Sequence, residues 1–441
     1  MRLCRSVLIR RIPENPCPIA PESFQTPVHV LYMHQYFGTR ASTTGTRSYE
    51  FSKFLLRRGH RVTMLTSGRD NVDGFNCRPG QGFARFETDG IEVIAINAAY
   101  NNPHKGTGMN GAKRMLHFLD FARLAARVGR QLQRPDVVFA TSTPLTIGLP
   151  GIRLARHFSV PFVFEVRDLW PDALINVGAL KNPVVIWWLR RTERRLYHAA
   201  DHLVALSPGM KEGIMRQGIP DERVTVIPNG SDLDLFRPDI DGSAERARLG
   251  LGDRFSAIYF GAMGRANGLD YVIEAARELQ QRARDHIVFV LHGDGGMRPQ
   301  LEELARRYEL RNVVFSNLVP DKAAVARIVA GCNACMTIYA ATDKEQTWSP
   351  NKMFDALAAG KPVLINVPGW LGETIQENRA GRSLDPQRPA ALAETVEELA
   401  ARPGLCAEMG RNARNLAEAQ FSREALAARL EEVLRSTIDR S

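Results

Sequence analysis

The sequence predicts an α/β fold in which two doubly wound parallel sheets, one in each half of the chain, face a common cleft. Three observations lead to this fold class. The 441 residues are enough for two to three domains of ~100–200 residues. Short apolar runs alternate with longer stretches of helical period, which is typical of βαβ units. The alternation starts again after the turn cluster Pro228-Asn229-Gly230-Ser231, so two halves of similar size are expected.

Each half is predicted to contain its own series of strands. In the first half they are expected at His29–Tyr32, Arg61–Leu65, Val137–Ala140, Phe162–Val166, His202–Leu206 and Val224–Ile227. In the second half they are expected at Ser256–Phe260, Ile287–Leu291, Val313–Ser316, Ala334–Ile338 and Pro362–Ile365, with helices such as Asp270–Arg284 and Met297–Tyr308 between them and a helical closing stretch, Pro403–Asp439. Because ligands of open α/β sheets bind beyond the carboxyl ends of the strands, the site is expected between the halves.

Composition excludes several classes of protein. A hydrophobic content of 44% and a charged content of 24% are globular values, which excludes a disordered or fibrous chain. No apolar run approaches the ~20 residues of a membrane span. Residues 1–27 are interpreted as a separate tail whose apolar stretch, Ser6–Ile9, is too short for a signal peptide, so a cytoplasmic location is expected. Cys332 and Cys335 are interpreted as buried strand residues rather than metal ligands, because no second Cys/His pair accompanies them.

The charge balance points to an anionic partner. Lys and Arg exceed Asp and Glu by 58 to 48, a formal charge of +10. Such an excess favours nucleic acid, a phosphorylated ligand or an anionic membrane surface. No zinc-finger spacing, heptad basic region or aromatic RNA-binding signature supports nucleic acid. The segment Pro183–Arg195 combines two Trp with four Arg at helical spacing, and is either an interfacial helix on an anionic membrane or a core-packing helix with a basic exposed face.

Loops rich in small residues follow several predicted strands. The loop Gly38–Gly45 precedes a helix, whose N-terminus favours an anion. In the second half, the stretch Gly261–Gly268 and the run His292-Gly293-Asp294-Gly295-Gly296 repeat this arrangement, and Arg265 adds a guanidinium. Each loop is interpreted as a ligand loop or as an ordinary turn; two consecutive Gly-rich strand ends favour a nucleotide-like ligand.

The stretch Thr347–Leu364 is the most informative part of the sequence. Ser349 or Asn351 is predicted to cap a helix that runs to Ala359, with Gly360 just beyond its end. Lys352 then lies beside a helix N-terminus that favours an anion. Asp355, about one turn further, is predicted to accept hydrogen bonds from a diol such as a ribose, or else to be a solvated surface carboxylate.

Charged residues also end a strand of the first half. Glu165-Val166-Arg167-Asp168 is followed by Trp170 and Asp172. Arg167 and Asp168 are predicted to face the cleft and to bind an acceptor hydroxyl and a phosphate-bearing group. The alternative is a loop salt bridge between Arg167 and Asp172.

Taken together, these residues resemble the retaining GT-B glycosyltransferases of family 4, in the branch that builds bacterial surface polysaccharides such as O-antigen, capsule and exopolysaccharide. The resemblance covers most of residues 28–430 and rests on the order and spacing of HQYFGTRASTTGTRSYEFSKFLLRRGHRV, EVRDLWPDA, ALSPGMKEGI, VIPNGSDLDLF, YFGAMGRANGLDYVIEAA, HGDG and SPNKMFDALAAGKPVL. It implies two Rossmann-like domains: residues 28–232 for the acceptor, residues 233–412 for the donor, and a helix at 413–441 that crosses back.

The resemblance implies transfer of a sugar from a nucleoside diphosphate to a lipid-linked or oligosaccharide acceptor, without a metal. The expected carrier is UDP and the expected sugar is N-acetylated. The sequence departs from the family where a cationic pair is usual, at Ala262 and Asn267, and where a first Glu is usual, at Thr347. Arg167 stands where a His is often seen. A nucleotide-sugar 2-epimerase and a non-catalytic nucleotide-sugar binding protein are the alternatives.

The predicted site is therefore assembled from both halves. The predicted catalytic residues are Arg265, Lys352, Asp168 and Arg167, with positive groups aimed at the charge that develops on the leaving diphosphate. The predicted donor-binding residues are Gly38, Thr44, Gly45, Gly261, Met263, Gly264, Gly293, Asp294, Ser349, Pro350, Asn351, Met353 and Asp355.

Overall fold

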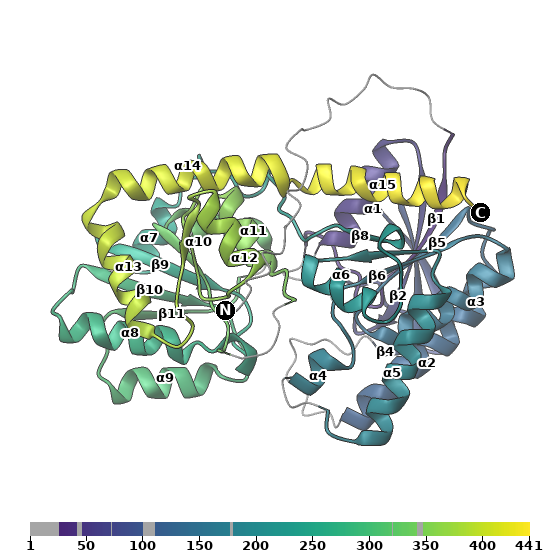
Figure 1. Ribbon diagram of the computed structural model, residues 1–441, viewed down its shortest axis with the longest axis horizontal. Coiled ribbons are helices and arrows are strands. Elements are labelled where there is room, and N and C mark those ends of the chain that lie inside the picture. Colours follow the sequence, from purple (N-terminus) through teal and green to yellow (C-terminus); the bar gives the residue numbers. More distant parts are fainter. Residues whose placement is uncertain are drawn as a thin grey trace, which may run out of the picture.

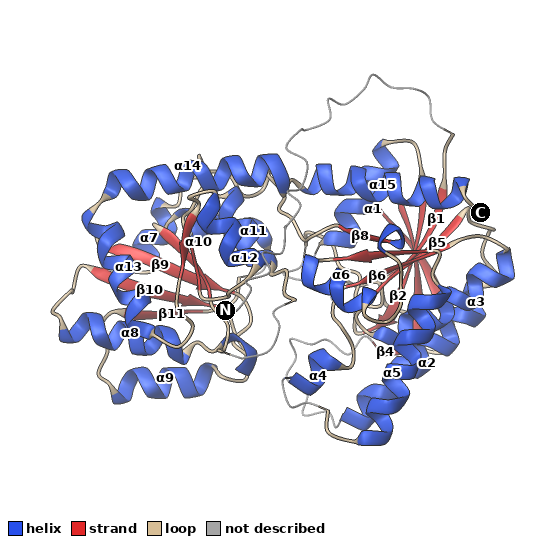
Figure 2. Cartoon of the chain, viewed as in Figure 1, coloured by secondary structure: helices blue, strands red, loops and turns tan. Residues whose placement is uncertain are grey.

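The structure, a computed structural model, describes residues 26–41, 46–71, 73–99, 111–176, 180–319, 321–341 and 347–441. Two α/β domains lie next to each other, and the last two helices run along one side of both (Figure 1). The first domain has an eight-stranded sheet of order β3-β4-β2-β1-β5-β6-β7-β8, and the second a six-stranded sheet of order β11-β10-β9-β12-β13-β14 (Figure 2). The predicted fold class is confirmed.

The N-terminal sheet is parallel except at one edge. All six predicted strands are present, as β1 His29–Met33, β2 Arg61–Arg69, β5 Val137–Thr141, β6 Phe162–Val166, β7 His202–Ala205 and β8 Val224–Val226. The sequence interpretation missed β3 Phe83–Thr88 and β4 Ile91–Ala99, which form an antiparallel pair beside β2. The helices are α1 Arg47–Arg57, α2 Gly111–Gly129, α3 Gly148–Phe158, α4 Asp172–Asn176, α5 Pro183–Ala199 and α6 Pro208–Met215.

The C-terminal sheet is parallel throughout. It contains the five predicted strands, β9 Phe255–Phe260, β10 Ile287–His292, β11 Val313–Ser316, β12 Ala334–Thr337 and β13 Val363–Ile365, and the unpredicted β14 Gly381–Ser383. Its helices are α7 Ser243–Arg248, α8 Asp270–Gln281, α9 Arg298–Arg307, α10 Lys322–Ala330, α11 Asn351–Ala358, α12 Trp370–Glu377 and α13 Pro389–Ala401, with a 3₁₀ turn, η3, at Arg265–Asn267. Cys332 and Cys335 are buried free thiols, as predicted, and burial raises the pKa of Cys332 to about 11.

The closing helical stretch is two helices, α14 Pro403–Gln420 and α15 Arg423–Asp439. α14 packs on the C-terminal domain and α15 on α1 of the N-terminal domain (Figure 1). The chain passes between the domains beside residues 228–232, where the Ser231 N–H donates to Phe421 O at 3.0 Å and the Arg423 N–H donates to Ser231 O at 3.0 Å. A side chain at Gly230 would place its Cβ 2.4 Å from Phe421 O, so this close approach requires glycine.

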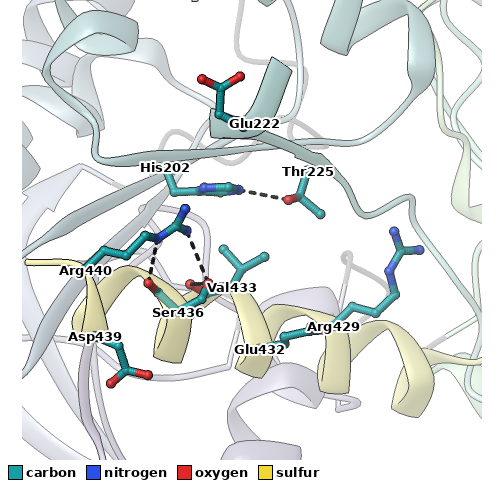
Figure 3. A pocket seen from close by; sticks show the side chains of 9 residues that line it. All are labelled: His202, Glu222, Thr225, Arg429, Glu432, Val433, Ser436, Asp439 and Arg440. Carbon is teal, nitrogen blue, oxygen red and sulfur yellow. Dashed lines mark hydrogen bonds between the residues drawn. The ribbon is translucent and has the colours of Figure 1, made fainter. Parts of the chain in front are cut away.

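None of the helices in the described ranges combines the length and the apolar character that crossing a bilayer requires. A hollow of about 680 Å³ lies between α15 and the β7–β8 edge, away from the predicted site (Figure 3). It is lined by basic and acidic side chains together: His202, Glu222, Thr225, Arg429, Glu432, Val433, Ser436, Asp439 and Arg440. No predicted site residue lines it.

Candidate active site

Two glycine-rich loops of the C-terminal domain lie against each other. The Gly261 N–H donates to His292 O at 3.0 Å, and the Met263 N–H donates to Asp294 O at 2.8 Å. A Cβ on Gly293, whose φ is +138°, would lie 2.0 Å from Gly261 O, so no other residue fits this contact. The loops that follow β9 and β10 therefore present bare backbone, as an anion-binding loop does. Met263 itself is fully buried, so only its backbone is available to a ligand.

Lys352, in the first turn of α11, reaches this double loop. Its Nζ donates to Tyr259 Oη at 2.5 Å and lies 3.8 Å from the centroid of the Tyr259 ring. A Cβ at Gly261 would lie 3.4 Å from the Lys352 Nζ, so the amine borders the loop backbone. The phenol of Tyr259 in turn donates to Ala262 O at 2.6 Å.

The amine of Lys352 has no carboxylate partner among the described residues, because none of the described ion pairs includes it. Burial lowers the pKa of Lys352 to about 7. A half-buried cation that has no counter-charge among the described residues and lies beside glycine-rich loop backbone is an electrostatic site for an anion. The structure thus places the amine of Lys352 beside the loop at Gly261, a contact that the sequence analysis did not predict.

The other predicted cation does not join it. Arg265, in η3, is exposed and makes no described side-chain contact. Asn267, which stands where the family often has a Lys, accepts a hydrogen bond from the Gly264 N–H at 3.0 Å and so shapes the loop. In this conformation Lys352 is the cation at the loop, while Arg265 points to solvent.

The predicted cap of α11 is wrong. Pro350 occupies the N-cap position without a side-chain hydrogen bond. Ser349 Oγ instead accepts from the Asn229 N–H of the other domain, at 3.0 Å. Asn351 is the first residue of the helix and is half-buried, and Met353 is fully buried, so its side chain belongs to the core. Gly360, with φ +64°, follows the helix as predicted.

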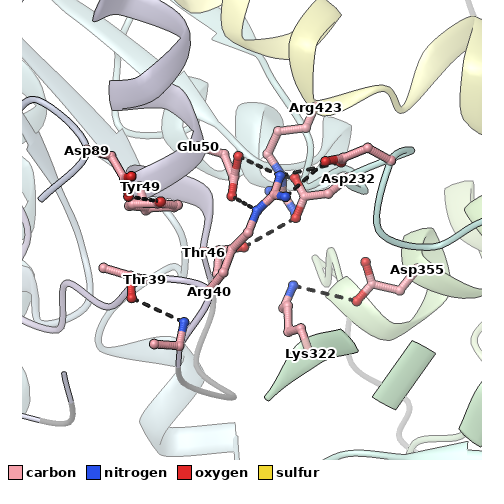
Figure 4. Close-up of polar contacts among 12 residues, drawn as sticks. Thr39, Arg40, Thr46, Tyr49, Glu50, Asp89, Asp232, Lys322, Asp355 and Arg423 are labelled. Atoms are coloured by element: carbon pink, nitrogen blue, oxygen red, sulfur yellow. Dashed lines mark hydrogen bonds and ion pairs between the residues drawn. The ribbon is translucent and has the colours of Figure 1, made fainter. Parts of the chain in front are cut away.

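Asp355 is not a solvated surface carboxylate, since only 4% of it is exposed. Its Oδ1 accepts from Ser231 Oγ at 2.9 Å, and its Oδ2 lies 3.9 Å from Lys322 Nζ (Figure 4). Burial raises the pKa of Asp355, and the charges of Lys322 and Arg423 only partly offset it. Asp355 therefore lies where the two domains join, and its role toward a ribose stays a prediction.

Lys322 was missed by the sequence interpretation. It is 8% exposed in the first turn of α10, whose N-cap Asp321 accepts from the Ala324 N–H at 2.7 Å. The capping pattern Asp-x-x-Ala is the local signal that fixes where this helix begins. Nothing in the chain's local pattern connects Lys322 to Asp355, 33 residues away.

On the N-terminal side, Asp168 follows β6. Its Oδ2 accepts from Thr143 Oγ1 at 2.8 Å, and burial raises its pKa although the hydrogen bond and Arg167 act the other way. The loop salt bridge between Arg167 and Asp172 is absent: Asp172 pairs with Arg190 at 3.2 Å. Asp168 also contributes, after burial, to raising the pKa of Tyr339, which follows β12 in the other domain. The carboxyl ends of β6 and β12 thus approach each other.

Gly38 is buried at the end of β1, and Thr44 and Gly45 lie outside the described residues. Arg40, in the same loop, pairs with Glu50 and reaches Asp234 of the interdomain segment at 2.9 Å (Figure 4). Nearby, Arg423 Nε lies 2.8 Å from Asp232 Oδ1. Burial alone would raise the pKa of Asp232, but the charges of Arg423 and Lys322 hold it below its ordinary value.

No group of three or more His, Cys, Asp or Glu side chains with metal-binding geometry occurs among the described residues. The expectation of metal-independent chemistry stays a prediction.

Comparison with known proteins decides the family. Residues 42–230 match the family described as Glycosyl transferase 4-like domain, and residues 243–416 match Glycosyl transferases group 1. The chain belongs to the GT-B glycosyltransferases. The two matches cover the two domains, with the interdomain segment between them.

The sequence relatives of this glycosyltransferase carry related names. It is 29% identical over 268 residues to a putative colanic acid biosynthesis glycosyl transferase, WcaI, of Escherichia coli, over 58% of this chain and 64% of that protein's length. It is 27% identical over 293 residues to a probable glycosyltransferase, WbjE, of Pseudomonas aeruginosa, over 64% and 69%. A D-inositol 3-phosphate glycosyltransferase of Xylanimonas cellulosilytica is 28% identical over 410 residues, or 88% of this glycosyltransferase and 90% of the relative.

Solved structures agree on the fold. A sucrose-phosphate synthase of Thermosynechococcus elongatus superposes with a TM-score of 0.74 at 18% identity, over 94% of this chain and all of that one. Anabaena Alr3699/HepE in complex with UDP and glucose gives 0.67 at 18% identity, over 93% and 100%. The lipopolysaccharide glycosyltransferase WaaG gives 0.63 at 16%, over 92% and 99%. At these identities the likeness establishes the fold alone.

Proposed function

We propose that this glycosyltransferase moves a sugar from a nucleoside-diphosphate donor to a lipid-linked or glycan acceptor, with retention of anomeric configuration and without a metal. The proposed carrier is UDP and the proposed sugar an N-acetylated amino sugar. The proposed context is synthesis of a bacterial surface polysaccharide on the cytoplasmic side of the membrane. The names of WcaI and WbjE support this context, and the UDP complex of HepE supports the carrier.

The observation that carries the proposal is the unpaired amine of Lys352 above the Gly261 loop. Cleavage of the donor leaves negative charge on the diphosphate, so a preorganised cation at that point stabilises the transition state more than the ground state. The departing phosphate oxygen takes the acceptor's proton on the same face, so no separate base is required. Asp168, held by Thr143, orients the acceptor hydroxyl.

The test is a panel of donors, UDP-N-acetylglucosamine, UDP-glucose and GDP-mannose, scored for thermal stabilisation and for release of free nucleoside diphosphate. A polyprenyl-diphosphate-linked sugar is the acceptor. Acceptor-dependent release, with an α-linked product by NMR from an α-linked donor, is the expected result. GDP-mannose belongs in the panel because three relatives are named as GDP-mannose-dependent.

The alternatives give different results in the same assay. A 2-epimerase would convert UDP-N-acetylglucosamine to its epimer without an acceptor. A binding protein would be stabilised by a donor but would release no diphosphate. Neither alternative is favoured by the relatives, which are named as glycosyltransferases or as a glycogen synthase. Either result would overturn the proposed function.

An anionic membrane surface is the proposed second partner, through the outer face of α5. Leu189, Leu196 and Tyr197 of this helix are buried, so it does pack on the core, but Val184 is 70% exposed and Trp187 is 62% exposed. Arg191, Arg194 and Arg195 continue the exposed stripe. An apolar tip followed by basic side chains fits a bilayer interface with anionic headgroups.

Vesicle sedimentation tests this partner. We expect the chain to bind phosphatidylglycerol vesicles and to lose binding in the variant Trp187→Ser, Arg191→Glu, Arg194→Glu. The control exchanges two exposed arginines of the other domain, Arg306→Glu and Arg307→Glu, with the same number of arginine charges reversed. Equal loss in both variants, or binding to phosphatidylcholine vesicles alone, would contradict a site on α5.

A further inference from the structure

An aromatic pair borders Lys352 and has no role in the chemistry described above. Tyr339 follows β12 and Trp348 precedes α11, and their rings stack with centroids 3.9 Å apart at 28°. Both residues are half-buried. Tyr339 packs on the C-terminal core and simultaneously lies near Asp168 of the N-terminal domain. The pair therefore forms a wall where the domains meet.

The wall is held rigidly by hydrogen bonds to its backbone. The Asn366 side chain accepts from the Tyr339 N–H at 2.8 Å and donates to the Tyr339 carbonyl at 2.9 Å. The carbonyls of three successive residues, Thr347, Trp348 and Ser349, accept from side chains of three different elements: Ser207, Trp370 and Asn229, at 2.9, 3.2 and 2.6 Å. Two of these donors belong to the N-terminal domain. Preorganised aromatic area of this kind loses little entropy when a ligand packs on it.

The position of the wall, next to Lys352, indicates which part of the donor would contact it. Lys352 Nζ lies 5.9 Å from the Tyr339 ring centroid. If the diphosphate lies at Lys352, the sugar attached to it lies beside the Tyr339–Trp348 wall. One face of a pyranose is a patch of C–H groups, which packs on an aromatic face, while its hydroxyls remain free for polar groups.

We infer that the Tyr339–Trp348 pair is the platform on which the donor's pyranose ring packs. This inference rests on the proposed function and deepens it. Thr347 stands where relatives of the family often carry a Glu, and its carbonyl is engaged by Ser207. The donor sugar is accordingly recognised here through aromatic area rather than through a carboxylate at that position.

The experiment compares each nucleotide sugar with its own sugar-free diphosphate. Isothermal titration of the wild type measures dissociation constants for three pairs: UDP with UDP-N-acetylglucosamine, UDP with UDP-glucose, and GDP with GDP-mannose. The pair that the wild type binds is then measured with the variants Trp348→Ala, Trp348→Phe and Tyr339→Leu. We expect Trp348→Ala and Tyr339→Leu to weaken the nucleotide sugar about fivefold relative to the diphosphate. Trp348→Phe, which keeps an aromatic face, should retain most of the difference. Tyr308→Leu, at an aromatic residue of the same domain whose hydroxyl donates to Glu274, is the matched control and should change neither constant.

The ratio within one variant makes the outcome independent of folding losses, because damage to the fold weakens both ligands together. The inference is overturned if the ratio of the two dissociation constants, nucleotide sugar to diphosphate, is unchanged in Trp348→Ala and Tyr339→Leu. It is also overturned if these variants change only the KM of the acceptor, because the wall would then bind the acceptor sugar. If the wild type binds neither UDP nor GDP, the proposed function fails first. If it binds a diphosphate and the ratio does not move, the platform fails and the proposed function stands.

Discussion

The two domains treat a buried cation in opposite ways. In the N-terminal domain, Arg47 is 1% exposed and its guanidinium is 2.8 and 2.9 Å from Glu165 Oε1, with further bonds to the carbonyls of Pro228 and Ile227. In the C-terminal domain, Lys352 contacts the Tyr259 hydroxyl and the rings of Tyr259 and Tyr339, and has no carboxylate partner among the described residues. The first cation is neutralised within the protein, whereas the second leaves its charge available.

This difference separates a structural charge from a functional one. A fully paired buried ion contributes to the fold only as long as both partners stay, and it offers nothing to a ligand. A buried cation that has no counter-charge among the described residues costs stability in the free protein, and we expect an anion to bind there.

Arg47→Met should give the largest effect on stability. It leaves the carboxylate of Glu165, which is 0% exposed, without its partner, and breaking a buried pair in this way costs about 3–5 kcal/mol. Urea denaturation measures the loss. Arg57→Met, on the same helix but in an exposed pair with Glu424, is the control and should cost less than about 1 kcal/mol. A similar loss of unfolding free energy in both variants would show that the buried pair stabilises the fold no more than the exposed pair does.

Lys352→Met should have the opposite effect to Arg47→Met: a large loss of turnover without a loss of stability. We expect turnover to fall about 100-fold or more, because the cation that faces the leaving diphosphate is lost. The free energy of unfolding of the ligand-free chain at pH 7 should stay the same or rise, because the removed amine is desolvated and has no counter-charge. Steady-state rates and urea denaturation of the same preparations check both parts. Arg265→Met, which removes an exposed side chain, should lower turnover less; the opposite order would return the main role to Arg265.

The sequence predicted the architecture well because each parallel strand is a short apolar run bounded by loops. It missed β3 and β4 because their pairing is antiparallel and lies at an edge, and β14 because three residues, Gly381–Ser383, carry no periodic signal. It identified Lys352 as a cation beside a helix N-terminus that favours an anion, but it did not place the amine at the Gly261 loop. The close packing of Gly293 on Gly261 is a contact between two loops and has no pattern in either.

The parts of the site that the sequence could not supply are those made by tertiary contacts. Ser349 reads locally as a helix cap, but Asn229 from the other domain takes its hydroxyl. Asp172 reads as a partner of Arg167 within one loop, but Arg190 on α5 lies closer. Asp355 reads as a surface or ribose-binding carboxylate, and Ser231 contacts it only because the chain crosses between the domains there. In each case the local sequence pattern allowed the predicted contact, but a residue distant in the sequence, which no local pattern reveals, binds the side chain instead.

Affinity for the diphosphate should depend on pH through Lys352. The pKa of its amine in the ligand-free chain is about 7, so the charged form that attracts the diphosphate is lost as pH rises from 6.5 to 8.5. Where this loss is complete, affinity for UDP falls up to about tenfold per pH unit. The sign for stability follows from the same shift: the unfolded chain keeps the proton up to its higher, ordinary pKa, so stability of the free chain rises with pH above 7.

Isothermal titration of UDP at pH 6.5, 7.5 and 8.5 measures this dependence. Lys352→Arg is the informative control, because a guanidinium stays charged throughout the range and should flatten the profile while keeping affinity at pH 6.5. A wild-type profile as flat as that of the Arg variant would mean that the amine is charged in the free chain at all these pH values.

Tyr259→Phe should give the smallest effect and isolates how the amine is held. The variant keeps the ring under Lys352 at 3.8 Å but removes the hydroxyl that accepts from its Nζ and donates to Ala262 O. We expect turnover to fall only a few-fold, since the cation–π contact and the chain's path remain. The hydroxyl accepts from the ammonium, so its loss should move the midpoint of the pH profile for UDP binding downward. A merely structural role of Tyr259 would lower stability and leave this midpoint where it is, so the direction of the shift decides between the two.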